Sequence, residues 1–402
     1  SDAPAIRFKG FSDAWEQRKL GDIGETYTGL SGKTKADFGH GQARFVTYMN
    51  VFSNPISNPE MTEPIEIDPK QNEVEVGDVF FTTSSETPEE VGMSSVLLEK
   101  RGKTYLNSFC FGFRPSEIID SYYLAYMLRS ESARDKIILL AQGISRYNIS
   151  KNKVMEIAVS LPSLDEQKLI GQYFRQLDNL IALHQRKFEK LTNVKKSMLE
   201  KMFPQNGSSY PEIRFKGFTD PWEQRKLSEM CGTFEYGLNA AAKEFDGKNK
   251  YIRITDIDDA SREFLLSDLS SPDICLDGMS KYLLSSGDIV FARTGASVGK
   301  TYIYRENDGI VYFAGFLIRA KVNQDNDAEF VFQSTLSPSY EKYIRITSQR
   351  SGQPGVNAQE YGEYDLFAPS KEEQQRIGQF LRGIDNLITL HQRELEKLQN
   401  IK

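Results

Sequence analysis

The chain has 402 residues and a formal net charge of −6; 39% of its residues are hydrophobic and 26% are charged. This composition is ordinary for a folded protein and excludes wholesale disorder, while the length favours two domains with connecting helices over one core. No apolar run approaches the roughly 18–20 residues that cross a bilayer, and the first residues lack a signal-peptide pattern, so we expect a cytoplasmic protein with no membrane partner.

The few cysteines and histidines argue against a metal centre. Cys110, Cys231 and Cys275 are odd in number and lie far apart, and the three histidines are equally scattered. Neither a disulfide framework nor a zinc site uses such spacings. We therefore expect no metal and no cofactor bound by this chain.

In chain order, the first elements are short strands followed by a helical stretch. Runs rich in aromatic and β-branched residues predict strands at 44–49, 78–82 and 109–113, and a helical stretch at about 119–140. Together they predict a mixed α+β domain over residues 1–160.

A long helix is predicted after Pro162. Apolar residues recur at alternating spacings of 4 and 3, which is the a/d seam of a coiled coil, and Phe203-Pro204 stops the pattern. The helix would have roughly 38 residues and, at about 1.5 Å per residue, a length near 57 Å. The predicted seam in this segment, 161–206, consists of Ile170, Phe174, Leu177, Ile181, His184, Phe188 and Leu191.

The chain then repeats itself with a shift of 207 residues. IRFKGFSDAWEQRKL at 6–20 and IRFKGFTDPWEQRKL at 213–227 are identical at 13 of 15 positions. PSLDEQKLIGQYFRQLDNLIALHQRKFEKL at 162–191 matches PSKEEQQRIGQFLRGIDNLITLHQRELEKL at 369–398 at 19 of 30 positions. The sequence therefore contains an internal duplication.

The second copy predicts the same order of elements. Strands are expected at 251–254, 288–292, 301–304 and 315–318, and a helical stretch at 328–346, within a second domain at 207–367. A second long helix is expected at 368–402. Its seam consists of Ile377, Leu381, Ile384, Ile388, His391, Leu395 and Leu398. Because this copy ends at Lys402, we expect either a shortened chain or a disordered tail.

Two similar seams in one chain most simply pack against each other as an antiparallel pair with a pseudo-twofold axis. We therefore predict two related mixed α/β domains separated by two long antiparallel coiled-coil helices. His184 and His391 lie on the seam, where a polar residue can fix the register. A hydrogen-bonded histidine pair is favoured there over a catalytic or metal-binding role.

The inserts between the repeated blocks barely resemble each other. A constant frame with a variable insert is expected if the frame binds the same partner twice while each insert recognises something different. The alternative is that one insert accumulated neutral substitutions after the duplication. Neutral substitution alone, however, should also have changed the repeated blocks, which remain nearly identical.

Polar loops of the inserts carry side chains suited to DNA. Arg, Lys, Asn and Gln match base edges in the major groove, and small polar residues let the backbone approach phosphates. The candidate DNA-binding residues are Lys33, Lys35, Arg44, Tyr48, Thr83, Ser84, Ser85, Arg146, Tyr147, Asn148, Lys248, Lys250, Arg253, Arg293, Thr294, Ser297, Lys300, Arg350 and Gln353. The acidic net charge requires that partners supply part of the positive surface.

Motifs of catalysis are missing from the sequence. Gly295–Thr301 has three residues between its glycines where a phosphate-binding P-loop has four, and a strand rather than a helix is predicted after Lys300. The sequence contains no motif that activates water, a nucleophile or a methyl donor. We therefore expect no catalytic residues and no small-molecule substrate.

The repeated blocks resemble those of the specificity subunits of Type I restriction–modification systems. The resemblance rests on IRFKGFSDAWEQRKL, on GDIVFARTGASVGK and on Pro-Ser-x-x-Glu-Gln-x-x-Ile-Gly, and it extends across both copies. It implies two target recognition domains, each of which reads half of a split DNA sequence, held apart by two conserved antiparallel helices. The helices would also dock two methylation subunits.

The same resemblance implies which partners perform the chemistry. Methylation subunits would use S-adenosylmethionine to methylate adenine in double-stranded DNA, and two restriction subunits would use ATP and Mg²⁺ to translocate and cut it. The first insert departs from the family pattern, because it has Thr83-Ser84-Ser85 where the second has Arg293-Thr294-Gly295. The resemblance therefore implies DNA contacts by Arg293 and Lys300 in the second half, and no equivalent contacts in the first.

Two other functions remain open at this point. A tandem protein–protein adaptor would use the inserts to bind proteins and the helices as a spacer. A nucleotide-hydrolysing protein would use Gly295–Thr301, and it would require nucleotide binding that Lys300→Ala abolishes.

Overall fold

The computed structural model describes residues 4–205, 207–350 and 352–402. Contacts between residues divide the chain into two compact units, unit 1 with residues 1–181 and Lys402, and unit 2 with residues 182–401. The division falls inside helix α5 (Leu164–Lys201). The domain boundaries predicted from the repeat, after residues 160, 206 and 367, remain a prediction. Ser1–Ala3, at the start of the first predicted domain, and Asn206, at the second boundary, lie outside the described residues.

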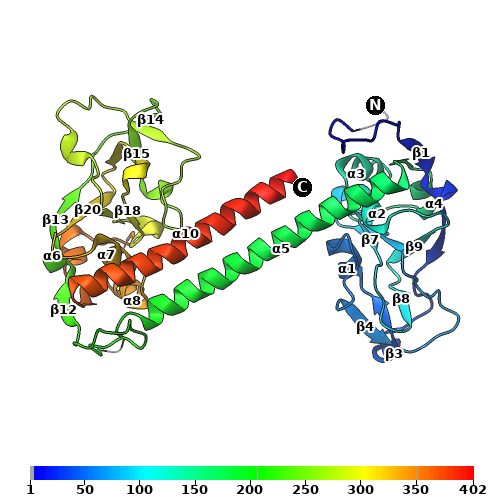
Figure 1. Cartoon of the computed structure of the whole chain (residues 1–402), viewed down its shortest axis with the longest axis horizontal. Helices are drawn as coiled ribbons and strands as arrows, with labels where there is room; N and C mark the ends of the chain where they lie inside the picture. The colour runs from blue at the N-terminus through cyan, green and yellow to red at the C-terminus, as the bar shows by residue number, and fades with distance from the viewer. Residues whose placement is uncertain (1–3, 206, 351) are drawn as a thin grey trace. The chain divides into compact units, whose positions relative to one another are not determined.

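Unit 1 contains a four-stranded antiparallel sheet and a smaller mixed sheet (Figure 1). The larger sheet has the order β2-β9-β5-β7 and the smaller one β4-β3-β8, in which β3 and β8 are parallel. The strands are β1 (Glu16–Lys19), β2 (Gly24–Thr28), β3 (Phe38–Val46), β4 (Thr62–Ile65), β5 (Val79–Thr82), β6 (Ser84–Ser85), β7 (Ser94–Val96), β8 (Thr104–Leu106), β9 (Cys110–Pro115), β10 (Tyr147–Asn148) and β11 (Ala158–Leu161). The short helices are α1 (Tyr48–Ser53), α2 (Ser121–Met127), α3 (Glu131–Ile138) and α4 (Lys151–Met155).

Unit 2 repeats this topology. Its four-stranded sheet has the order β13-β20-β17-β18, and a parallel pair, β15-β19, occupies the place of β3-β8. The strands are β12 (Glu223–Lys226), β13 (Cys231–Tyr236), β14 (Ala242–Glu244), β15 (Lys250–Ile252), β16 (Ser270–Pro272), β17 (Asp288–Ala292), β18 (Thr301–Ile303), β19 (Val311–Phe313), β20 (Leu317–Val322) and β21 (Asp365–Ala368). The helices are α6 (Leu227–Met230), α7 (Ala328–Ser334), α8 (Pro338–Thr347), α9 (Ala358–Gly362) and α10 (Lys371–Ile401).

The inserts therefore share a fold although their sequences differ. Both need a glycine at the end of the first sheet strand, because the backbone of another segment passes very close. A Cβ on Gly29 would lie 2.0 Å from the carbonyl oxygen of Asn107, and one on Gly237 would lie 2.1 Å from that of Ala314. Only glycine fits such an approach.

The repeated blocks form a frame that joins the two ends of each insert. Strand β1, before the first insert, pairs antiparallel with β11, which follows it, and β12 pairs with β21 in the same way. Arg7 binds Glu166 of α5 through two hydrogen bonds of 2.7 and 2.8 Å, and Arg214 binds Glu373 of α10 through two of 2.7 Å. Both glutamates are buried.

Several predicted elements end earlier than expected. The strand predicted at 44–49 stops at Val46, because the Thr47 hydroxyl accepts a hydrogen bond from the Asn50 amide and caps α1. The helical stretch predicted at 119–140 is broken into α2 and α3 by Ser130, which caps α3. Ser337, which caps α8, breaks the stretch predicted at 328–346 in the same way.

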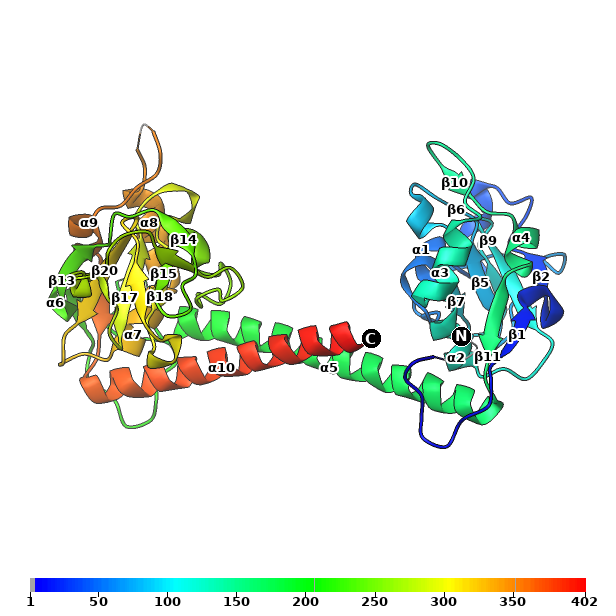
Figure 2. The same cartoon turned by 90° about the horizontal axis from the view of Figure 1, so that it is seen from above.

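The long helices agree with the heptad pattern. Helix α5 has 38 residues and α10 has 31. Within unit 2, His184 faces His391 and Lys195 faces Asp385, so residue numbers rise along one helix as they fall along the other. The predicted antiparallel pairing is confirmed for this part of α5, which lies beside α10 in both views (Figures 1 and 2).

Helix α10 and the end of α5 share the core of unit 2. Leu199 of α5 and Leu381 of α10 belong to the same buried cluster, to which Phe330 of α7 and Trp222 also belong. Figure 2 shows α7 between the sheet and α10. No helix in the described part of the chain is both long enough and apolar enough to cross a membrane.

Candidate nucleic-acid interface

In unit 1, the central strand of the sheet ends in a cluster of predicted DNA-binding residues. Strand β6, with Ser84 and Ser85, pairs with β10, with Tyr147 and Asn148, and the Tyr48 hydroxyl donates to the carbonyl of Ser84 at 2.7 Å. Figure 2 shows β6 and β10 at the end of the unit opposite α5. The fold thus brings together residues that lie as far apart as 48 and 148 in the sequence.

Thr83 lies at the base of this cluster. Its amide and its hydroxyl both donate to the carbonyl of Phe109, at 3.0 and 2.9 Å. The Phe109 side chain is 57% exposed. Arg146 is exposed beside the cluster, whereas the side chains of Ser84 and Ser85 are buried. Phe109, Arg146 and Asn148 are therefore among the residues exposed at this end of the unit.

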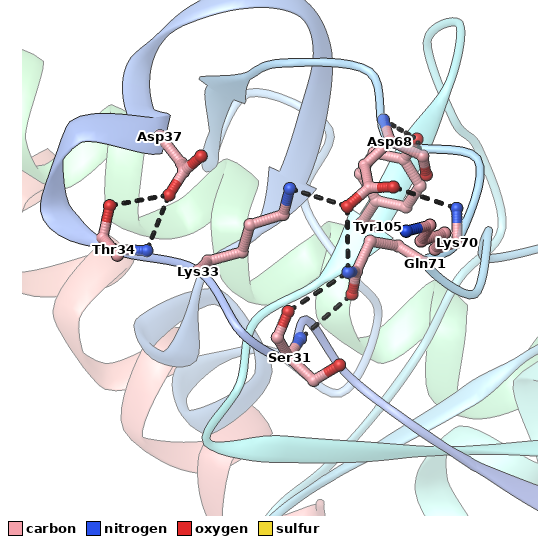
Figure 3. Close-up of polar contacts among 8 residues, drawn as sticks. All are labelled: Ser31, Lys33, Thr34, Asp37, Asp68, Lys70, Gln71 and Tyr105. Carbon is pink, nitrogen blue, oxygen red and sulfur yellow. Dashed lines mark hydrogen bonds and ion pairs between the residues drawn. The ribbon is translucent and has the colours of Figure 1, made fainter.

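Lys33 and Arg44 of unit 1 already have partners within the protein. The Lys33 ammonium lies 2.8 Å from Asp68, which also accepts hydrogen bonds from Lys70 and Gln71 (Figure 3). These contacts, led by the one from Lys33, hold the pKa of Asp68 well below its ordinary value. The Arg44 guanidinium donates to Thr62. Lys35 is exposed.

In unit 2, Arg293 follows the corresponding strand, β17. Its guanidinium carbon lies 5.1 Å from the ring centroid of Tyr236 and 5.8 Å from that of Phe316. Its Nε is buried and has no hydrogen-bond partner in the described part of the protein. Arg293 also lines a cavity of 530 Å³, together with Tyr251, Arg253 and Asn239. No acidic residue lines this cavity in the described structure.

Thr294 and Gln353 lie beside Arg293. Thr294 forms a bridge with Gly355, and the amide of Gly295 donates to the carbonyl of Pro354. This contact corresponds to the β6–β10 pairing of unit 1. Gln353 is exposed, and Arg350 is exposed but forms an ion pair with Glu360.

The basic residues of the region 248–253 are less available than the sequence suggests. Lys248 is exposed, but the Lys250 ammonium donates to the carbonyl of Asp308 at 2.7 Å. Arg253 forms two hydrogen bonds of 2.8 Å with Asp256. Only Lys248 of these three therefore offers an unengaged charge.

Ser297 and Lys300 line a different cavity, of 610 Å³, beside α8 and the end of α5. Lys300 is 7% exposed, and its ammonium lies 3.0 Å from the Ile257 carbonyl and 2.6 Å from Asp259. Its charge is already neutralised inside the protein. A DNA contact would require Lys300 to break both interactions.

The predicted seam residues lie on the less exposed faces of the two long helices. Leu177, Ile377, Leu381 and Ile384 are buried, and the other predicted seam residues are half-buried. The Phe174 ring lies 5.3 Å from that of Tyr126. The Nδ1 atoms of His184 and His391 are 3.1 Å apart, a hydrogen bond that requires one ring to be neutral.

Exposed aromatic residues beside the polar loops were not predicted from the sequence. Tyr236, Phe316 and Phe109 are each more than two-fifths exposed beside the predicted polar loops, which is unusual for such large apolar side chains. One signal was present in the sequence: Phe109 and Phe316 are identical and lie 207 residues apart in a region where the copies otherwise differ.

Three features of the described structure bear on catalytic chemistry. It contains no group of three or more histidine, cysteine or acidic residues able to hold a metal. Burial raises the pKa of the Cys110 and Cys231 thiols to about 12, so both are protonated at neutral pH. Gly295–Ser297 forms a single 3₁₀ turn and Thr301 begins β18, so this segment lacks the helix of a phosphate-binding loop.

Comparison with known proteins decides the family. The pattern of the family described as the Type I restriction modification DNA specificity domain matches twice, at residues 12–193 and 219–400. The chain belongs to this family. Both copies are covered almost completely, and the family match does not favour the protein–protein adaptor.

Relatives and solved structures agree with this assignment. The chain is 26% identical over 298 residues to the Type I restriction enzyme MjaVIII specificity subunit of Methanocaldococcus jannaschii, covering 71% of this chain and 68% of the relative. It is 22% identical to the putative MjaX specificity subunit of the same organism, covering 96% and 91%. The crystal structure of the Type I S subunit of M. genitalium matches with a TM-score of 0.62 at 15% identity, covering 99% of this chain and 96% of that one, which supports the fold.

Proposed function

We propose that this chain is the DNA-recognition subunit of a Type I restriction–modification complex, in which each unit reads one half of a bipartite, asymmetric target. One observation carries the proposal. The frame and the sheet topology are repeated, whereas the half-buried side chains at corresponding ends of β5 and β17 differ, with Thr83 in one unit and Arg293 in the other. Two readers of one fold with different surfaces suit a target with two unlike halves.

The two halves are expected to read bases mainly through loops at the end of each central strand. Arg146, Asn148, Lys35, Lys248, Arg293, Thr294 and Gln353 are the predicted contacts that keep exposed or unengaged polar atoms. Lys33, Arg44, Lys250, Arg253, Lys300 and Arg350 are engaged within the protein. We therefore propose that these six residues stabilise the loops and do not contact DNA directly.

The outer faces of the long helices suit the docking of two copies of one partner. Three pairs of apolar residues are exposed at matching positions: Tyr173 (42%) with Phe380 (39%), Leu180 (43%) with Leu387 (46%), and Leu183 (39%) with Leu390 (51%). Exposed apolar stripes mark interaction sites. We assign these stripes to two methylation subunits, and we assign the spacer of the DNA target to the long helices.

The chemistry is assigned to partner subunits. Methylation subunits that bind S-adenosylmethionine would methylate adenine, and restriction subunits that bind ATP and Mg²⁺ would translocate and cut DNA. This chain then contributes sequence recognition and assembly in the cytoplasm. Its acidic net charge is compatible with this role if the partners supply basic surface.

Exchange of an insert tests the proposal. Residues between β12 and β21 are replaced by the corresponding segment of another family member, and methyladenines are mapped by single-molecule sequencing in cells that carry the methylation subunits. We expect one half of the methylated sequence to change to that of the donor and the other half to stay. Methylation that ignores the exchange, or that shows no bipartite sequence with the unaltered chain, contradicts the proposal.

A further inference from the structure

Arg293 and Thr83 occupy the same place in the two units. Each follows the central sheet strand, and the amide of each donates to the carbonyl of an exposed phenylalanine: Arg293 to Phe316 at 3.1 Å and Thr83 to Phe109 at 3.0 Å. Both phenylalanines are 57% exposed. The backbone frame at this point is therefore common to the two units.

The side chains around this common frame differ in chemistry. Tyr236, the last residue of β13, contacts the Arg293 guanidinium. Thr28, the last residue of β2, holds the same position in unit 1. Tyr236 pairs with the second residue of the neighbouring strand β20, and Thr28 pairs with the second residue of the neighbouring strand β9. The Thr83 hydroxyl is occupied by the carbonyl of Phe109. Unit 2 thus presents a guanidinium where unit 1 presents no free donor from Thr83.

Two aromatic rings hold this guanidinium in place. Contact with Tyr236 and Phe316 restricts the rotation of a long side chain, so less conformational entropy is lost when Arg293 binds a ligand. No carboxylate within the described residues forms an ion pair with Arg293, and its buried Nε lacks an acceptor. Because this Nε is shielded from solvent, an external acceptor can reach only the terminal Nη donors, whose plane the two rings orient.

A planar pair of N–H donors matches two acceptors that lie side by side. In the major groove only guanine offers two acceptors on one base, O6 and N7, and arginine binds both at once. A backbone phosphate also accepts two hydrogen bonds, but it carries no sequence information. Two rings fix the plane of the Arg293 guanidinium, and a donor pair in a fixed plane suits the planar edge of a base better than a phosphate.

We propose that Arg293, held by Tyr236 and Phe316, is a specificity-determining residue that reads one guanine in the half-site bound by unit 2. The inference rests on the proposed function, since it requires that unit 2 binds DNA. It adds the base and the residue that selects it. The corresponding base of the other half-site is not read by an arginine at this position.

The test uses the full chain assembled with its methylation subunits and a pool of duplex DNA with randomised half-sites. Bound sequences are determined for the unaltered chain and for Arg293→Thr, Arg293→Lys and Thr83→Ala. We expect a guanine at one position of one half-site with the unaltered chain. Arg293→Thr and Arg293→Lys should reduce the preference for this guanine by about 5- to 100-fold, as expected for loss of a two-point contact, without changing the other half-site.

Thr83→Ala is the matched control, and it should leave the guanine preference intact. Thermal unfolding of each variant verifies that unit 2 is folded. An unchanged sequence preference in Arg293→Thr, or an equal loss of affinity for all sequences, overturns the inference, because the second result identifies a phosphate contact. Absence of any selected sequence with the unaltered chain instead refutes the proposed function.

Discussion

At the scale of single residues, the aromatic contacts of Arg293 separate recognition from stability. Tyr236 and Phe316 are 44% and 57% exposed, and neither belongs to a buried core cluster of unit 2. Their rings instead orient a charged group at the surface. Residues of this kind can be changed with a local effect on DNA recognition.

Tyr236 provides a prediction on recognition. In Tyr236→Ala the guanidinium loses one of its two rings, and we expect the guanine preference to fall by about 2- to 5-fold, which corresponds to a cation–π contact of about 0.5–1 kcal/mol. Tyr236→Phe keeps the ring and should retain the preference. Competition binding between duplexes that differ in this one base pair measures both. Equal behaviour of the two variants would contradict a role for the ring.

Arg214 provides a prediction on stability. Its removal in Arg214→Met leaves the buried carboxylate of Glu373 without its two hydrogen bonds, and we expect the free energy of unfolding of unit 2 to fall by about 2 kcal/mol. The control is Arg225→Met, because Arg225 pairs with the exposed Glu223 and such a pair contributes about 0–1 kcal/mol. Urea titration of both variants should rank them in this order.

At the scale of elements, helix α10 contributes to stability with one face and remains exposed on another. Leu381 is fully buried against α7 and the end of α5, whereas Leu387 is 46% exposed. The two leucines lie six residues apart on one helix. They allow the inner and outer faces to be tested separately.

Leu381→Ala should destabilise unit 2 by about 2–5 kcal/mol, because the substitution removes buried apolar area and leaves a cavity. Leu387→Ala should change the stability by less than about 0.5 kcal/mol. Thermal or urea unfolding of the isolated chain distinguishes them. A large loss of stability in Leu387→Ala would mean that its face is covered in the free chain.

The histidine pair predicts a dependence of stability on pH. Partial burial lowers the pKa of His391, and the charges of His184 and Lys187 lower it further. Between the folded and unfolded pKa values, the unfolded chain binds more protons. The stabilisation is therefore complete above the ordinary histidine pKa of about 6.5 and is lost as the pH falls through the lower, folded value.

We expect the midpoint of thermal unfolding to drop between about pH 7.5 and pH 5.5, and to drop less in the double variant His184→Leu/His391→Leu. An equal drop in the double variant would show that other groups cause it.

The sequence predicts some of these elements well and others poorly, for physical reasons. The seam from Ile377 to Leu398 was predictable, because helical periodicity is a local property of the chain. The contact of Arg293 with Tyr236 and Phe316 was not, because three strands must align before residues so far apart in sequence meet. The buried state of Lys300 was hidden for the same reason: its partner Asp259 lies on a distant loop.

At the scale of the whole molecule, duplication predicts a partner stoichiometry. Leu183 and Leu390 are exposed at corresponding positions of α5 and α10. If each belongs to one docking surface, either Leu183→Asp or Leu390→Asp should reduce the number of bound methylation subunits from two to one, and the double variant should bind none. Native mass spectrometry of the assembled complex measures this directly.

The exposed Gln185 of α5 offers the control for this experiment, since Gln185→Asp introduces the same charge two residues from Leu183, on the opposite side of the helix from the apolar stripe. It should leave two subunits bound. Loss of both subunits in each single variant would contradict two independent docking surfaces.

The pairing of β1 with β11 and of β12 with β21 closes each insert at a single place in the frame. Because each insert leaves the frame and returns to it on adjacent strands, its length and content can change without displacing the helix that follows. Each insert is thus an exchangeable cassette. Genetic recombination within the near-identical flanking blocks would give the host a new DNA specificity in one step, with the assembly surfaces unaltered.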